Sequence, residues 1–220
     1  MDQIMGGPAL IEVTPLNKSA HVRLGGLRSG AMSFTSFFDA AAGAEHPILS
    51  TLPRTDTVAT YARGAVVGNP AACINSKQVN YDPTRSNAGD LTLKVDCQSN
   101  GYGLEWGIQL TPGLRTDSAA TVGAFYDNAA ASILGAQAYF QVTAFSGTSV
   151  TIDVQSATTS GGSYTTTGMT SQAFTATGFQ RVAVTSAATI SRYIKVVTTG
   201  TFSNAVFSVV VNFNLTAVVF

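Results

Sequence analysis

Hydrophobic and polar residues alternate along much of this 220-residue chain with the period of two that is typical of half-buried β-strands. The clearest case is residues 91–98. Its apolar positions, 91, 93, 95 and 97, would face a core, and the positions between them would face away. Residues 31–38 repeat the pattern, and residues 71–81 and 101–110 are expected to form further strands. The first half of the chain therefore predicts a sheet with one buried face.

One segment favours a helix. In residues 46–52, Pro47 suits a first helical turn, while Ile48, Leu49 and Leu52 would share one face before Pro53 ends the helix. A helix this short must be held by packing.

From residue 136 onward, strand signals return at intervals of about ten residues, as a β-sandwich or jelly roll requires. The expected strands include residues 138–145, 149–155, 193–198 and 205–213. Residues 111–135 are rich in small residues and are expected to connect the two parts.

The charge pattern changes at residues 101–117. Before this segment, charges of both signs alternate. Beyond Asp127 the only acidic residue is Asp153. We therefore expect a first domain over residues 1–117, a connecting segment over 118–135 and a second domain over 136–220.

Only 11% of the residues are charged, 45% are hydrophobic and the formal net charge is zero. Solubility usually depends on a charged surface. Either Thr, Ser and Gly cover this surface, or much of it is buried against copies of the same chain.

The sequence has no cluster of Lys and Arg residues of the kind that a general nucleic-acid binder needs. The run 205–220 falls short of a membrane span, and the start lacks the features of a secretory signal, so we expect synthesis in the cytosol and no membrane partner.

The residues needed for catalysis are scarce, so we expect no enzyme, no cofactor and no metal. The only histidines, His21 and His46, lie in the first quarter, and no nucleophile elbow is present. Cys73 and Cys97 lack metal-ligand spacing and are interpreted as two buried thiols.

A carboxylate pair is the remaining enzymatic alternative. Glu105, beside the only Trp of the chain, could act with Asp90 or Asp96 in the manner of a glycosidase. An ordinary ion pair of Glu105 with Lys94 or Arg63 is favoured over this. Four aromatic residues could instead line a glycan-binding face, although their strand pattern also suits core positions: Tyr139, Phe140, Tyr164 and Tyr193.

Short strings spread over the chain resemble the major tail proteins of bacteriophages with long, non-contractile tails. The strings are LGGLRSG at 24–30, MSFT at 32–35, HPILS at 46–50, LPRTD at 52–56, GNPAA at 68–72, LEWG at 104–107, LRTD at 114–117 and the pattern from GAQAY at 135–139 through Arg192 and Tyr193.

This resemblance implies a tail-tube-like β-sandwich or barrel with one short helix, followed by an outward-facing immunoglobulin-like or jelly-roll β-sandwich. It implies homo-hexameric rings that stack, with other tail proteins, into a tube through which double-stranded DNA passes without specific binding. The location would be the virion tail, and the host cytoplasm during assembly. Alternatives are a capsid decoration protein, a tail-tip or baseplate subunit, or a glycan-binding module.

A lumen that lets DNA pass should be polar or acidic. Candidate lumen or inter-subunit residues are therefore Asp90, Lys94, Asp96 and Glu105, and Trp106 is expected to anchor the core.

Overall fold

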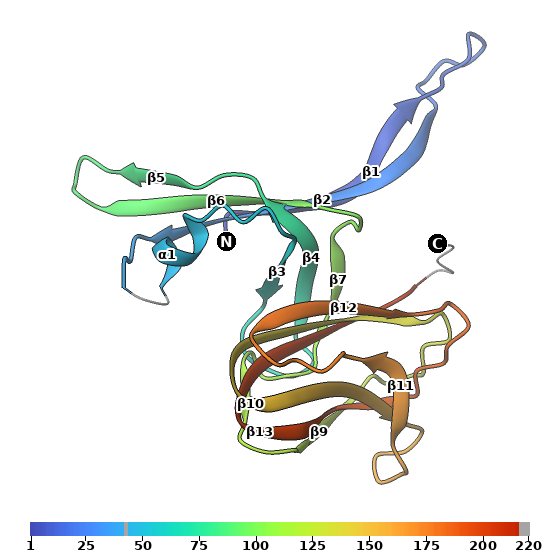
Figure 1. Ribbon diagram of the computed structural model, residues 1–220. Helices are drawn as coiled ribbons and strands as arrows, with labels where there is room; N and C mark the ends of the chain where they lie inside the picture. The colour runs from blue at the N-terminus through green and yellow to red at the C-terminus, as the bar shows by residue number, and fades with distance from the viewer. Residues whose placement is uncertain (42–43, 216–220) are drawn as a thin grey trace. The chain divides into compact units, whose positions relative to one another are not determined.

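The computed structural model describes residues 1–41 and 44–215 and consists mainly of antiparallel β-strands, with one short helix in the described residues (Figure 1). This confirms the predicted mainly-β fold. The chain divides into two compact units, Met1–Ala59 with Ile74–Glu105, and Thr60–Cys73 with Trp106–Phe220. We call these the first and second unit.

The first unit is built on a sheet in which β6 is central. β2 pairs with one side of β6, while β5 and β4 pair with successive parts of its other side. β1 pairs only with β2, and β3 pairs with β4. β3 and β4 each cross the division between the units, so the first part of β4, up to Cys73, is counted with the second unit. The bounds are β1 Gln3–Glu12, β2 Arg23–Phe37, β3 Thr57–Ala62, β4 Pro70–Gln78, β5 Asp82–Arg85 and β6 Leu91–Ser99.

The alternation expected in residues 91–98 is confirmed in β6, because Leu93, Val95 and Cys97 are buried. The strand expected at 31–38 is the second half of a longer strand, β2. β1 was not predicted. Residues 82–85, expected in a turn, form β5 because they pair with residues 91–94 of β6.

The predicted helix is present as α1, Glu45–Leu49, and is shorter than expected. It is held from outside, as its length requires. The side-chain amide of Gln78 donates to the Leu49 carbonyl at 2.8 Å, and His46 Nδ1 lies 2.6 Å from the Tyr81 hydroxyl.

The second unit is organised by two long strands, β10 and β13, which pair from Ala136 opposite Phe213 to Ala157 opposite Tyr193. β12 pairs with the first half of β10 and β11 with its second half. β7 and β8 pair with the second half of β13, and β9 with its first half. The bounds are β7 Glu105–Gln109, β8 Arg115–Asp117, β9 Val122–Asp127, β10 Ala136–Ala157, β11 Thr165–Thr170, β12 Gly178–Val184 and β13 Tyr193–Phe213.

Irregular pairing between Val142 and Ser149 divides this ladder in the middle. Strands that bend at such points can serve both layers of a sandwich. Inward-facing residues of both halves form one apolar core, which includes Phe140, Ile152 and Phe207. The predicted sandwich therefore forms from two bent strands where the sequence suggested four separate ones.

The units also differ from the expected domain limits. The segment 118–135 contains β9, which pairs with β13 and so is part of the second unit's sheet. Its small residues concealed this strand, because its partner lies about 70 residues further along the chain. The last five residues of the expected second domain, 216–220, lie outside the described residues.

Candidate assembly interface

The polar face of the first unit's sheet carries two of the candidate residues, Lys94 and Asp96. Directly paired residues of antiparallel strands share a face. Lys94 of β6 is paired with Thr35 of β2 and with Asp82 of β5, and Asp96 is paired with Ser33. The pairing thus places polar side chains side by side across three strands, and the exposed Phe37 of β2, opposite Thr92, lies at the end of the same face.

Lys94 and Asp96 are brought together on this face. Lys94 Nζ lies 3.7 Å from Asp96 Oδ1, a long contact between partly exposed groups. Asp96 is fixed from the other side, where the Asn80 amide donates to Asp96 Oδ2 at 2.6 Å. Exposed pairs of this kind contribute little to stability, so this arrangement determines surface charge more than it stabilises the fold.

The face is acidic overall. Asp82 and Asp96 lie on it, and Asp2 accepts a hydrogen bond from the hydroxyl of Thr35. Lys94 lies on this face, and Lys77 of β4 shares it because it is paired with Gln98 of β6; the charge of Lys77 is matched by Asp56, 2.6 Å away. Asp90 lies apart from this group, in the turn between β5 and β6, where its backbone N–H donates to Ser86 Oγ at 3.1 Å.

Glu105 and Trp106 start β7, and the expectation of a core anchor is wrong for Trp106. Its side chain is 51% exposed and contacts Tyr61 edge to face, with ring centroids 6.5 Å apart. The pairing of β7 with β13 begins only at Ile108, so Trp106 lies beyond the strand segment that contributes to the core. Glu105 is partly exposed beside it and is the last residue of the first unit.

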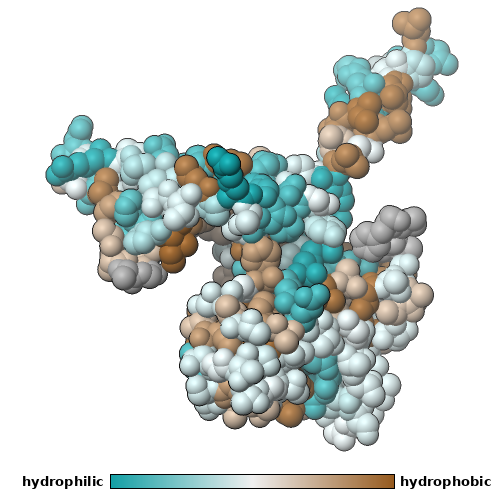
Figure 2. All heavy atoms as spheres, in the orientation of Figure 1, coloured by the Kyte–Doolittle hydropathy of each residue, from teal (hydrophilic) through white to brown (hydrophobic). Residues whose placement is uncertain are grey.

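A second candidate surface was missed by sequence reasoning. Beyond the region covered by β6, residues 6–28 form a two-stranded hairpin that pairs only with itself; we call it the arm (Figure 1). Nearly all of its residues are exposed, and apolar side chains gather along it (Figure 2). The signal in the sequence was the alternation of Ala9, Ile11 and Val13, which Gly6, Gly7 and Pro8 partly concealed.

The glycan-binding alternative loses two of its four aromatic residues. Tyr139 and Phe140 are buried. Tyr164 and Tyr193 are partly exposed, but a cation already covers one face of each ring: Lys195 Nζ lies 4.0 Å from the Tyr164 centroid, and the Arg192 guanidinium 5.1 Å from that of Tyr193.

Cys73 and Cys97 are buried and form no disulfide, as the sequence suggested, and the Cys73 sulfur lies 3.2 Å from the Thr60 hydroxyl. Among residues 1–41 and 44–215, no cluster of three or more His, Cys, Asp or Glu side chains is placed to hold a metal ion. Over the same residues, no helix is long and apolar enough to cross a membrane.

No protein-family profile matches this chain, and no curated protein matches it. Among solved structures, the chain is similar to the Dit (gp 19.1) protein of SPP1, described as a paradigm of the hub adsorption apparatus in phages that infect Gram-positive bacteria. The sequence identity is 12%, and the alignment covers 97% of this chain and 93% of that chain, with a TM-score of 0.30. A TM-score this low does not establish a shared fold.

Proposed function

We propose that this protein is a structural virion protein of a long-tailed bacteriophage, forming stacked hexameric rings that build the tail tube. The proposal rests on one observation above the others, the two-faced sheet of the first unit. One face of β2 and β6 contributes Met32, Leu93 and Val95 to a buried layer, while the other face is mostly polar, with more acidic than basic side chains. This division suits a wall with packing on one side and a lumen on the other.

The charge of the polar face fits the passage of DNA. A surface that binds duplex DNA needs Lys and Arg side chains to displace the counterions of the phosphates. Here Lys94 lies between Asp82 and Asp96 in the pairing of the strands, and the net charge of the face is negative. Repulsion between like charges keeps a passing polyanion from adhering to such a wall.

Self-association fits the low charge content of the chain and the open strand edges of the first unit. β1 pairs with β2 on one side only, so its other edge presents free backbone groups to a neighbouring chain. A head-to-tail contact between identical subunits closes into a ring when the rotation permits. The same protein would then assemble in the host cytoplasm and remain in the virion with other tail proteins.

Electron microscopy of the purified protein in negative stain tests the proposal, together with sedimentation velocity. Hollow rings or tubes with sixfold end views are the expected result. A trimer or a monomer that coats capsids would indicate a decoration protein, and a single ring that never stacks would indicate a tail-tip or baseplate subunit. Either result overturns the tube proposal.

A further inference from the structure

The arm carries an apolar face that its own chain does not cover. Pairing of Ile11 with Leu24, and the backbone bond from Val13 to Val22, place these four side chains on one face together with Ala9. Ile11 is 52% exposed and Leu24 56%. Alternation of this kind is the pattern of a half-buried strand, yet the covering layer is missing from the described part of this chain.

An isolated two-stranded hairpin is at best marginally stable in water. The arm is nevertheless held firmly at its root. A Cβ at Gly30 would lie 2.6 Å from the backbone nitrogen of Leu104, and one at Gly6 would lie 2.6 Å from the Leu104 Cβ. Only glycine permits this close approach, and both glycines have ordinary φ angles, so their role is packing rather than turning. The root of the arm is therefore packed closely against Leu104.

Charge favours a second copy of this chain as the covering partner. The arm has three basic residues, Lys18, Arg23 and Arg28, against one acidic residue, Glu12. The remainder of the first unit has eight acidic residues against four basic ones. A basic arm and an acidic body on the same molecule attract each other between copies, which speeds and orients their encounter.

The matching apolar surface lies at the α1 end of the first unit. Ile48 and Leu52 are exposed there, next to the acidic residues Asp39 and Glu45. The Glu45 carboxylate accepts a long hydrogen bond from Ser36 Oγ at 3.4 Å. Opposite charges and uncovered apolar side chains therefore occur at two separate places on one unit, as a head-to-tail contact requires.

From these observations we infer that the apolar face of the arm docks on the α1 surface, Asp39, Glu45, Ile48 and Leu52, of a second copy. The inference rests on the proposed self-assembling function and names the contact that carries it. The face with Ile11 and Leu24 packs on Ile48 and Leu52, while the basic side chains of the arm meet the acidic ones around α1.

A pair of arm variants tests this contact in the full chain. Ile11→Ser with Leu24→Ser removes the apolar face, and Leu10→Ser is the matched control, because Leu10 is also exposed but lies on the opposite face of the same strand. In sedimentation velocity we expect the double variant to need about a hundredfold higher concentration to assemble, since each tenfold corresponds to about 1.4 kcal/mol of lost burial. The Leu10 variant should assemble like wild type.

Disulfide trapping tests the partner surface. Ile11→Cys protein is mixed with Ile48→Cys protein under mild oxidation, and a covalent dimer is expected. Leu114→Cys, an exposed position in the second unit, replaces Ile48→Cys as the control. Equal trapping with both partners overturns the inference.

Failure of the inference and failure of the proposed function give different results. If wild-type protein forms tubes and the Ile11, Leu24 double variant forms them equally well, the arm contact is wrong while the tube remains. If wild-type protein forms neither rings nor tubes, the proposed function itself fails.

Discussion

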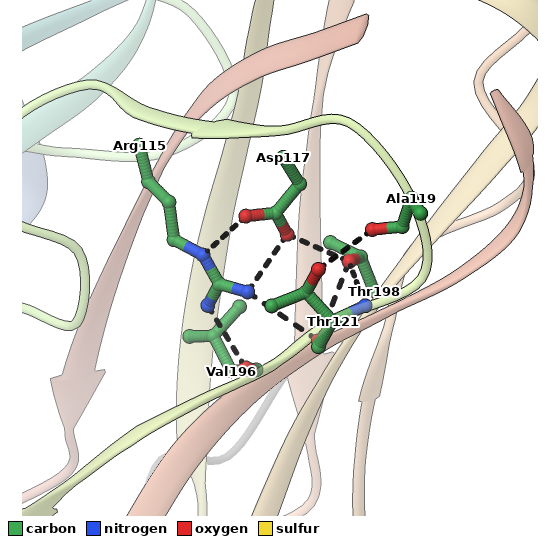
Figure 3. Close-up of polar contacts among 6 residues, drawn as sticks. All are labelled: Arg115, Asp117, Ala119, Thr121, Val196 and Thr198. Atoms are coloured by element: carbon green, nitrogen blue, oxygen red, sulfur yellow. Dashed lines mark hydrogen bonds and ion pairs between the residues drawn. The ribbon is translucent and has the colours of Figure 1, made fainter. Parts of the chain in front are cut away.

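Arg115 and Asp117 form a bidentate ion pair in the second unit, with Arg115 Nε 2.8 Å from Asp117 Oδ1 and Arg115 Nη2 2.7 Å from Asp117 Oδ2 (Figure 3). The pair is nearly enclosed, because the two side chains are only 13% and 3% exposed. Thr198 of β13 donates its hydroxyl proton to Asp117 Oδ2 at 2.7 Å, and Arg115 Nη1 donates to the Val196 carbonyl at 3.0 Å. Four residues of β8 and β13 are thus joined by one polar network.

Asp117→Ala should destabilise the second unit by about 3–5 kcal/mol, because it leaves the buried Arg115 guanidinium without its carboxylate. Denaturant unfolding followed by circular dichroism measures this loss. Asp153→Ala is a useful comparison, since Asp153 accepts hydrogen bonds from Thr166 and Thr170 but has no Arg partner among the described contacts. A loss below 1 kcal/mol for Asp117→Ala would show that the network is dispensable.

Gly30→Ala should lower the free energy of unfolding of the first unit by about 1–3 kcal/mol, because the added methyl overlaps the Leu104 backbone at the root of the arm. Gly7→Ala is the matched control one residue pair further out, where an added Cβ meets nothing within 4 Å. Thermal unfolding of the two variants side by side makes the comparison. Equal melting temperatures would contradict the packing role of Gly30.

A pH-dependent contribution is expected from Asp56. Hydrogen bonding to Lys77, whose Nζ lies 2.6 Å away, and then to Asn100 lowers the pKa of the Asp56 carboxyl below its ordinary value of 3.8. The pair therefore stabilises the folded chain at neutral pH, and this contribution is lost as the pH falls through the lowered pKa.

Lys77→Met should bring the pKa of Asp56 back toward its ordinary value, which a carboxyl NMR titration detects. The pKa of Asp127, which the hydrogen bond from Arg192 lowers in the second unit, is the internal control and should not change. A Lys77→Met variant whose Asp56 titrates as in wild type would contradict the assignment.

The two thiols should report on the two units separately. Burial raises the pKa of the Cys97 thiol in the first unit, and Cys73 is fully buried in the second. Neither should react with a thiol reagent in the native protein, and in increasing denaturant each should react as its own unit opens. Cys73→Ala and Cys97→Ala variants assign the two signals. Rapid labelling of either cysteine without denaturant would contradict its burial.

Adding a positive charge to the polar face of the first unit should make assembled tubes retain DNA. Thr84 lies on this face, opposite Thr92. Tubes of Thr84→Lys should carry short duplex DNA into the pellet at low salt and release it as salt rises. Thr165→Lys makes the same substitution at an exposed position of the second unit and should leave DNA in the supernatant. Equal retention by both would contradict a lumen role for this face.

The sequence predicted those strands whose own residues alternate clearly between apolar and polar positions. β6 and the core-facing residues of β10 and β13 alternate clearly, because each strand packs one face on apolar neighbours. β9 and β5 have weak patterns of their own, and they become strands through pairing with β13 and β6. Pairing between distant residues cannot be read from alternation alone.

For the candidate site, the sequence placed Lys94 and Asp96 on one face, but it could not show that β5 adds Asp82 beside them. The expectation for Trp106 was wrong because a single large aromatic residue in an apolar strand suggests a core position. The pairing of β7 with β13 involves only Ile108 and Gln109, and Trp106, which lies before them, is exposed. The arm was not predicted because its glycines resemble those of a loop, although Gly6 at its root permits the close contact with Leu104.

The central position of β13 in the second unit's sheet delays the folding of that unit. This strand pairs with β7, β8, β9 and β10, and its partners lie as far as about a hundred residues earlier in the chain. Contacts this distant in sequence form slowly, and none of them can form before the ribosome has released the strand. A nascent chain that stops short of residue 193 therefore lacks the strand that completes the second unit, so only chains that include β13 can supply that unit to an assembly.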